Sequence, residues 1–203
     1  MLRATTFFIC ALILSGLTAQ ELNNQVLKVA KAYEGGGYYW KGSTGTPKEL
    51  NFQNTRILGK STQGTHCSGY TFMVAFEVLN DNKLLDGQSV TTVKQLQRNW
   101  FGTTEQSAET QCLMALENLG LGKAVKMEDA KPGDFVQFWR NSKSGHSVIF
   151  LGWERDASGK ITGINYRSTQ KLTNGIGDRT ETIGLGEKDI NASRVYVVRL
   201  ENW

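Results

Sequence analysis

The sequence predicts an α+β domain in which N-terminal helices pack on one face of an antiparallel sheet. Apolar residues recur with helical spacing in the first part of the chain, and stretches rich in β-branched and aromatic residues follow in the second part. Short turns separate these later stretches, which favours a meandering sheet. The chain has 203 residues and shows neither an internal repeat nor a convincing linker, so we expect one domain.

The first 19 residues have the composition of a secretory signal peptide. Arg3 precedes an apolar run over residues 7–14, and Ala19 provides a small residue before Gln20. This run is too short to span a bilayer, and no second run of this kind follows it. We therefore expect cleavage after Ala19, a mature domain over residues 20–203, and a secreted or periplasmic protein with no membrane anchor.

The helical part is expected to begin with a helix over residues 21–34, which a run of three glycines ends. A long polar loop with little periodicity follows over residues 43–64. A second helix is expected from about Cys67 to Leu79. A short helix over residues 92–100 and a longer one over residues 104–119 complete this half of the chain.

The later part of the chain is expected to form strands. The segments 135–139, 146–153, 161–170 and 194–200 have the composition of strands, and the second is apolar throughout, as in a central strand. A looser glycine-rich stretch over residues 171–187 leads to the last strand.

Charge and residue content exclude several classes of function. The formal charge is +4, and removal of Arg3 leaves 22 basic against 19 acidic residues, or +3, which would suit an anionic polymer. The sequence contains no conspicuous run of basic residues, so a nucleic-acid partner is not indicated. Two histidines and scattered cysteines give no spacing of metal ligands, so we expect no metal and no cofactor.

Cys67 stands where a polar loop meets the start of the second helix. The unpaired N–H groups and the dipole of a helix start stabilise a thiolate and lower its pKa. Gly69 is expected to keep side-chain bulk away from the sulfur. Two alternatives stay open: Cys67 is a small buried hydrophobic residue, or it forms a disulfide with Cys112, whose position on a helix face is also explained by core packing.

His146 is the better candidate for a base among the two histidines of the chain. His66 is next to Cys67 in sequence, and neighbouring residues at such a junction rarely direct their side chains at each other. Residues 146, 148 and 150 share one face of a strand, and if that face meets the second helix, His146 reaches the sulfur. The alternative is a buried, hydrogen-bonded strand histidine.

A third polar group usually orients such an imidazole. The expected hairpin places residues 168–170 opposite His146, and Ser168 and Gln170 share a face with Ile164 and Tyr166. We favour Gln170, because its amide oxygen is a fixed acceptor, and keep Ser168 as the second candidate. Ordinary polarity at a strand end explains both residues equally well.

Four segments together resemble a known family. They are residues 38–43 (Tyr-Tyr-Trp-Lys-Gly-Ser), 66–70 (His-Cys-Ser-Gly-Tyr), 131–136 (Lys-Pro-Gly-Asp-Phe-Val) and 145–152 (Gly-His-Ser-Val-Ile-Phe-Leu-Gly). Their order and spacing resemble the NlpC-like and CHAP group of papain-like cell-wall cysteine peptidases and amidases. The chain departs from the family pattern at His66, where the family more often has Asp, and at Lys41, which replaces a glycine.

The resemblance implies a papain-like (NlpC-like) domain that cleaves an amide bond in peptidoglycan stem peptides, as an endopeptidase or an amidase. It implies Cys67 as nucleophile, His146 as base and acid, and a third polar group on the next strand. We expect a monomer whose partner is the peptidoglycan peptide. The residues expected to line the substrate site are Tyr38, Trp40, Ser68, Gly69 and Gly145.

Two other functions stay open on the sequence. One is a catalytically silent secreted domain that binds glycan or protein through an aromatic cleft formed by Tyr38, Tyr39, Trp40 and Trp139. The other keeps the Cys–His pair but acts as an acyltransferase or as a hydrolase of another amide or ester. The reactivity of the Cys67 thiol distinguishes the first of these from the enzyme.

Overall fold

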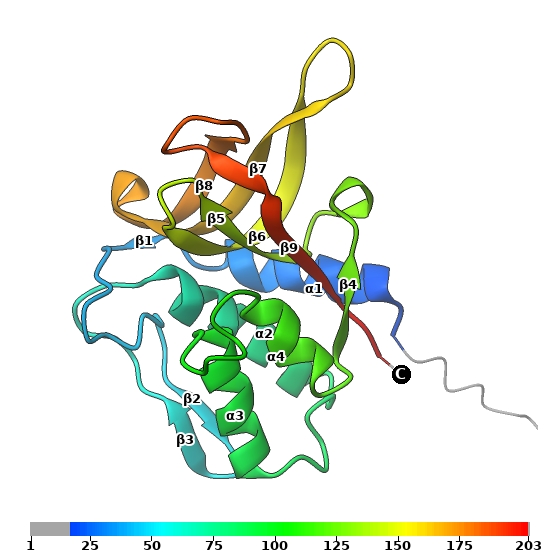
Figure 1. Cartoon of the computed structure of the whole chain (residues 1–203). Helices are drawn as coiled ribbons and strands as arrows, with labels where there is room; N and C mark the ends of the chain where they lie inside the picture. Colours follow the sequence, from blue (N-terminus) through cyan, green and yellow to red (C-terminus); the bar gives the residue numbers. More distant parts are fainter. Residues whose placement is uncertain (1–16, 203) are drawn as a thin grey trace, which may run out of the picture.

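The computed structural model describes residues 17–202. They form an α+β domain with a seven-stranded sheet in the order β1-β8-β7-β6-β5-β9-β4 and a separate hairpin of β2 and β3 (Figure 1). Every pairing between neighbouring strands of the large sheet is antiparallel. The predicted class, α+β with an antiparallel sheet, is confirmed. The expected signal peptide covers residues 1–19, of which residues 1–16 lie outside the described residues, while Thr18 and Ala19 form the start of α1.

The helices are α1 (Ala19–Lys31), α2 (Cys67–Asp81), α3 (Val90–Trp100) and α4 (Cys112–Glu117), with 3-10 turns η1 (Met127–Asp129) and η2 (Lys171–Thr173). The strands are β1 (Gly35–Gly36), β2 (Leu50–Phe52), β3 (Thr55–Leu58), β4 (Gly122–Val125), β5 (Phe135–Arg140), β6 (Gly145–Arg155), β7 (Ile161–Gln170), β8 (Gly175–Thr182) and β9 (Ile190–Leu200). Among the described residues, no helix combines the length and the apolar character needed to cross a bilayer.

Helix α1 begins with a capping box, in which Thr18 and Glu21 exchange hydrogen bonds between side chain and backbone. Leu22, Val26 and Ala30 are fully buried on its inner face, and their spacing of four residues is that of one face of a helix. The helix is therefore confirmed, with its ends shifted by two or three residues. Helices α2 and α3 also occupy their predicted segments.

Sequence reasoning missed five strands, the first of which is β1, in the glycine run that was expected only to end the first helix. The segment 43–64, expected to be a loop, contains the β2–β3 hairpin, and its turn residues Gln53 and Asn54 both have positive φ angles, 48° and 60°. Such a turn is usually marked by glycine, which is absent here. Strand β8 lies inside the glycine-rich stretch 171–187, and β4 has only four residues.

The predicted helix over residues 104–119 is wrong, because only α4 is helical in this segment. Thr104 and Ser107 hydrogen-bond to each other's side chains and backbone, which competes with helix formation. The Glu109 carboxylate is held by Arg194 at 2.8 Å, which draws the chain onto the sheet. Gln111 then takes a positive φ angle of 42° just before α4 starts.

The turn before β5, in which Gly133 and Asp134 are buried, fixes the helical half to the sheet. Asp134 is fully buried, and its carboxylate accepts hydrogen bonds from Arg199 at 2.8 and 2.9 Å and from Asn23 of α1 at 2.8 Å. Gly133 has a φ of 96°, and a Cβ there would lie 2.5 Å from the Asn23 carbonyl oxygen. This turn, part of the family-like motif 131–136, therefore has a structural role.

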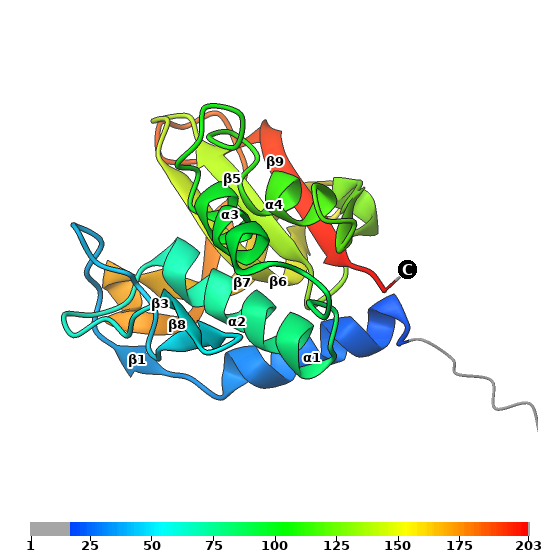
Figure 2. The ribbon, with the colours of Figure 1, turned by 90° about the horizontal axis from the view of Figure 1, so that it is seen from below.

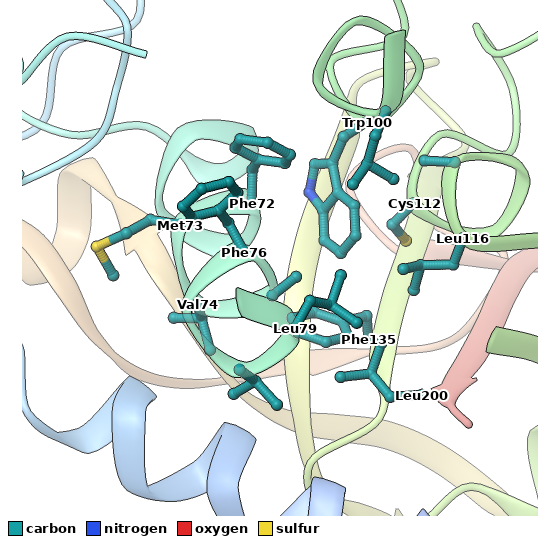
Figure 3. Close-up of a cluster of buried hydrophobic side chains, with 14 of the residues drawn as sticks. Phe72, Met73, Val74, Phe76, Leu79, Trp100, Cys112, Leu116, Phe135 and Leu200 are labelled. Atoms are coloured by element: carbon teal, nitrogen blue, oxygen red, sulfur yellow. The ribbon is translucent and has the colours of Figure 1, made fainter. Parts of the chain in front are cut away.

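The apolar residues form two clusters. The first joins the helices to the sheet, and Figure 3 shows Trp100 between Phe72 of α2 and Phe135 of β5. Helix α2 runs between α1 and α3 within this part of the molecule (Figure 2). The second cluster joins strand residues to one another: Val136, Phe138, Val148, Phe150, Ile164, Tyr166, Ile190 and Val197.

This division corrects one expectation about β6. Val148 and Phe150 belong to the second cluster, whereas Ile149 belongs to the cluster shared with the helices. The face of residues 146, 148 and 150 is therefore not the one that packs on the helical core. His146 nevertheless interacts with Cys67, as described below. Strand β6 is the fourth of seven in the sheet, which confirms its prediction as a central strand.

Candidate active site

Cys67 is the first residue of α2 and is only partly exposed. The preceding residue, His66, caps the helix: its Nδ1 accepts a hydrogen bond from the Gly69 N–H at 3.3 Å, and its Nε2 lies 3.1 Å from the Ser43 carbonyl oxygen. Because the Gly69 bond requires an unprotonated Nδ1, the proton of the neutral ring lies on Nε2 and is donated to Ser43. His66 therefore holds the helix start, a role that sequence reasoning missed.

Gly69 has a different role from the expected one. A Cβ at this position would lie 2.3 Å from the Thr44 carbonyl oxygen and 2.4 Å from the Gly45 carbonyl carbon. The loop therefore lies directly on the first turn of α2, and a Cβ on Gly45 would in turn meet the His66 ring at 2.3 Å. Gly69 is buried beneath this loop and makes room for it, rather than for the sulfur.

Cys67 and His146 come from distant parts of the chain and interact directly. Burial by itself would raise the pKa of the Cys67 thiol. The positive charge of His146, together with its hydrogen bond and that of the Ser147 backbone N–H, instead holds this pKa well below its ordinary value. The arrangement stabilises a thiolate beside an imidazolium ring, the activated form of a cysteine nucleophile.

Both cysteines of the described residues are free, so Cys67 and Cys112 do not form a disulfide. Cys112 is buried in the first cluster beside Leu116 (Figure 3), as its position on a helix face suggested. Burial raises the pKa of its thiol to about 12. Cys112 is therefore an inert core residue, and the alternative that removes the Cys67 thiol by oxidation is not supported.

His146 is 7 % exposed and packs edge-on against Phe138 and Tyr166, with ring centroids 5.7 and 5.5 Å away. Its Nε2 is buried and has no hydrogen-bond partner among the described residues. Because Nε2 has no partner among these residues, the interaction of the ring with Cys67 does not use this atom, and Nε2 is the atom that a third residue would orient. The alternative of a fully hydrogen-bonded structural histidine does not describe this ring.

Gln170 is the residue that faces this part of β6. Strand β6 pairs with β7 through Ile149 opposite Arg167 and Phe150 opposite Tyr166, and the same register continued to the strand end sets His146 opposite Gln170. Gln170 is 6 % exposed, and its Oε1 is likewise buried without a partner. A donor and an acceptor that both lack partners therefore occur at opposing positions of two neighbouring strands.

Ser168, the second candidate, is committed elsewhere. Its hydroxyl is fully buried and donates to the Ser147 carbonyl oxygen at 2.7 Å, which ties β7 to β6. In the β6–β7 register continued from the Ile149–Arg167 pair, Ser168 lies opposite Val148 and not opposite His146, so it is a poorer candidate than Gln170 for orienting the imidazole. It steadies the backbone of Ser147, whose N–H contacts the Cys67 sulfur.

The residues expected to line a substrate site divide into two groups. Tyr38 forms a backbone bridge with Thr65, and burial followed by the negative charge of Cys67 raises its pKa, which indicates that the phenol lies near the sulfur. Trp40 follows on the same segment and is 62 % exposed. The Ser68 hydroxyl lies 3.9 Å from the Cys67 sulfur.

Gly145 belongs to the second group, since it is explained by packing. A Cβ there would lie 2.9 Å from both the Gln137 side-chain nitrogen and the Trp139 ring. Trp139 itself donates to the Glu109 carbonyl oxygen at 2.8 Å and carries the Arg194 guanidinium 4.8 Å above its ring. Of the four aromatic residues proposed for a cleft, Tyr38, Tyr39 and Trp40 remain substantially exposed.

A buried ion pair supports the rings around His146, and sequence reasoning missed it. Arg140 binds Glu181 through two hydrogen bonds of 2.7 Å and lies 5.2 Å from the centre of the Phe138 ring. The Tyr166 hydroxyl also donates to Glu181. Although burial opposes the charge on Arg140, its hydrogen bonds to Glu181 raise its pKa. The Arg140–Glu181 ion pair therefore contacts both rings that pack on His146, Phe138 through Arg140 and Tyr166 through Glu181.

Among residues 17–202, no group of three or more His, Cys, Asp or Glu side chains is arranged to hold a metal ion. Comparisons with protein-family models, with curated proteins and with solved structures found no match to this chain. The site therefore has to be interpreted from its own geometry.

Proposed function

We propose that this protein is a secreted cysteine hydrolase that cleaves an amide bond in peptidoglycan stem peptides. The observation that carries the proposal is the contact of Cys67 with His146, which lowers the pKa of a largely buried thiol despite the opposing effect of burial. A structural cysteine has no need of such a partner, whereas a nucleophile does. The order of the four family-like motifs supplies the substrate class.

In the proposed mechanism the Cys67 thiolate attacks the carbonyl carbon of the scissile amide, and the imidazolium of His146 then protonates the leaving nitrogen. An acyl-enzyme remains on the sulfur. His146, now neutral, takes a proton from water, which attacks the thioester and releases the acid. Atoms and charges return to the starting state after each turnover.

Helix α2 offers donors for the tetrahedral intermediate. The first N–H groups of a helix have no acceptor within the helix. His66 accepts from Gly69, which leaves the N–H groups of Cys67 and Ser68 to bind an oxyanion. Tyr38 lies close enough for the Cys67 charge to raise its pKa, and its hydroxyl is a third donor. One such donor contributes roughly 3–4 kcal/mol in well-studied cases.

The finer assignment of the fold belongs to the same proposal. A papain-like domain of the NlpC type has N-terminal helices on one face of an antiparallel sheet, with the cysteine at a helix start and the histidine on a strand. The first apolar cluster, which links α1, α2, α3 and α4 to strand residues, agrees with this arrangement. A single domain over residues 20–203 and export after cleavage at Ala19 complete the proposal.

Digestion of purified peptidoglycan tests the proposal. The mature protein is incubated with the polymer, and the soluble fragments are compared by mass spectrometry with those from Cys67→Ala. New fragments from the wild type alone support a cysteine amidase or endopeptidase, and their masses identify the bond. Fragments from both proteins would refute Cys67 as the nucleophile.

Failure to release fragments would direct attention to the acceptor. If Cys67 reacts rapidly with a thiol reagent at neutral pH but peptidoglycan stays intact, the pair acts on another amide or ester, or transfers the acyl group. If Cys67 is unreactive, the protein is a binding domain, and the exposed segment from Tyr38 to Trp40 becomes the first surface to test.

A further inference from the structure

We propose that Thr173 is a positioning residue, which orients the Gln170 amide so that its oxygen faces His146. The inference rests on the proposed function, because it assigns the part of the site that keeps the imidazole in place. Thr173 ends η2, the short turn that follows β7, and lies three residues after Gln170.

The hydrogen bonds of Thr173 fix the direction of the amide. Its Oγ1 lies 2.5 Å from the Gly175 carbonyl oxygen and 3.3 Å from the Gln170 carbonyl oxygen. Carbonyl oxygens only accept, so the single hydroxyl proton is used there. The same Oγ1 lies 2.8 Å from the Gln170 side chain, and it can only accept from that side. The NH₂ end of the amide therefore has to face Thr173.

The opposite end of the amide is then fixed as well. With its nitrogen bound to Thr173, Gln170 directs Oε1 away from the turn, where this atom is buried and has no partner among the described residues. His146 Nε2 is buried and has no partner among the described residues either, and the β6–β7 register, continued from the Ile149–Arg167 pair, sets the two residues opposite each other. A flipped amide would present a donor to the imidazolium N–H, which is also a donor.

The turn is built to hold Thr173 in this position. A Cβ on Gly177 would lie 2.9 Å from the Thr173 Cβ, so only glycine leaves room for the side chain. Asn174 takes the left-handed conformation, with a φ of 49°, and closes the turn. Thr173 is itself outside the reacting pair, so it acts only through Gln170 and His146.

Two substitutions test the role. Thr173→Val keeps the shape of the side chain but removes the hydroxyl, and Thr173→Ser keeps the hydroxyl. The readout is the rate at which iodoacetamide alkylates Cys67, measured against pH by peptide mass spectrometry, which needs no substrate. We expect Thr173→Val to move the midpoint of this profile up by about one pH unit, or about tenfold in rate on its acid side. Thr173→Ser should restore the wild-type profile.

A second background separates orientation from loop stability. In Gln170→Glu both side-chain oxygens are acceptors, so either orientation of the carboxylate presents an acceptor to His146. The effect of Thr173→Val should therefore shrink to less than about twofold in the Gln170→Glu background. An equal effect in both backgrounds would show that Thr173 only stabilises the turn, and would overturn the proposal.

Nuclear magnetic resonance provides a readout that is independent of the thiol. The chain has two histidines, so His66→Asn leaves His146 as the only imidazole in the spectrum. A slowly exchanging Nε2 proton should be present with Thr173 or Ser and absent with Val. The two proposals can fail separately. If Cys67 in the wild type has the alkylation profile of an ordinary thiol, the proposed function fails. If the Nε2 proton signal still depends on Thr173 in that case, the positioning role stands. A signal that is unchanged in Thr173→Val overturns the positioning role.

Discussion

The dependence of Cys67 ionisation on His146 gives the sharpest prediction. In His146→Ala the thiol keeps its burial, which raises the pKa, and loses the interaction that lowers it most. The pKa should then reach at least the ordinary cysteine value of about 8.5. At pH 6.5 such a thiol is only ~1 % ionised, whereas the wild-type thiol is ionised to a large extent, so the alkylation rate should fall about 100-fold.

The assay follows the alkylation of Cys67 by iodoacetamide between pH 5 and 10, with each cysteine peptide quantified by mass spectrometry. His66→Asn is the matched control, because asparagine is a good helix cap and the variant removes the other histidine. It should change the rate much less than His146→Ala. A wild-type profile in His146→Ala, or a larger effect of His66→Asn, would refute the assignment of His146 as the partner.

Three further predictions concern stability. Gly69→Ala should lower the free energy of unfolding by about 1–3 kcal/mol, because the new Cβ would lie 2.3 Å from the loop backbone. A Cβ on Gly152 has no neighbouring atom within 4 Å, so Gly152→Ala should change the free energy of unfolding by less than about 0.5 kcal/mol. Equal effects of the two variants in thermal unfolding would contradict this. Arg199→Met should cost about 3–5 kcal/mol in urea unfolding, because Asp134 is left buried without its guanidinium, and a change below about 1 kcal/mol would disprove that role. The pKa of the Cys112 thiol is raised to about 12 in the folded chain, whereas an ordinary thiol has a pKa of about 8.5. Between these two values the unfolded state binds fewer protons than the folded state. The free energy of unfolding should therefore fall as pH rises from about 8.5 towards 12, by about 2 kcal/mol at pH 10. Cys112→Ala should remove this alkaline loss, and an unchanged loss would assign it to other groups.

The elements that could be predicted are those with a repeated local pattern. The buried face of α1 and the apolar β6 each have a period that specifies one type of structure. The segment 104–111 shows where this reasoning stops. Its composition suits a helix, but the contact of Glu109 with Arg194, 85 residues away, and the Thr104–Ser107 turn both favour another path. A pattern of neighbouring residues carries no information about a contact between residues so far apart in the sequence.

The candidate site divides in the same way. Cys67 and His146 could be proposed from residue type and motif order, because few residues can supply their chemistry. The capping role of His66 and the loop packed on Gly69 depend on the path of residues 43–45, which shows no periodicity. Ser168 and Gln170 share a face of β7, so alternation could not separate them. In the structure the continued register sets Ser168 opposite Val148, whereas Gln170 lies opposite His146 and has a buried oxygen without a partner among the described residues, which favours Gln170.

Comparison of the two cysteines shows which part of the site activates the thiol. Cys67 and Cys112 are both the first residue of a helix, and burial disfavours the thiolate of both. The pKa of Cys112 is nevertheless raised to about 12, while that of Cys67 is held well below its ordinary value. A helix start therefore does not lower a thiol pKa here by itself, contrary to the reasoning that first singled out Cys67.

Two differences separate these helix starts. Helix α2 has 15 residues and a side-chain cap from His66, whereas α4 has six residues and no side-chain cap. Cys67 also meets His146 and the Ser147 N–H, both from β6, while Cys112 meets apolar core residues. The partners on β6 supply the larger share, because the His146 charge is the strongest of the effects that lower the pKa. The position of β6 against the start of α2 is thus the feature of the fold on which the proposed chemistry depends.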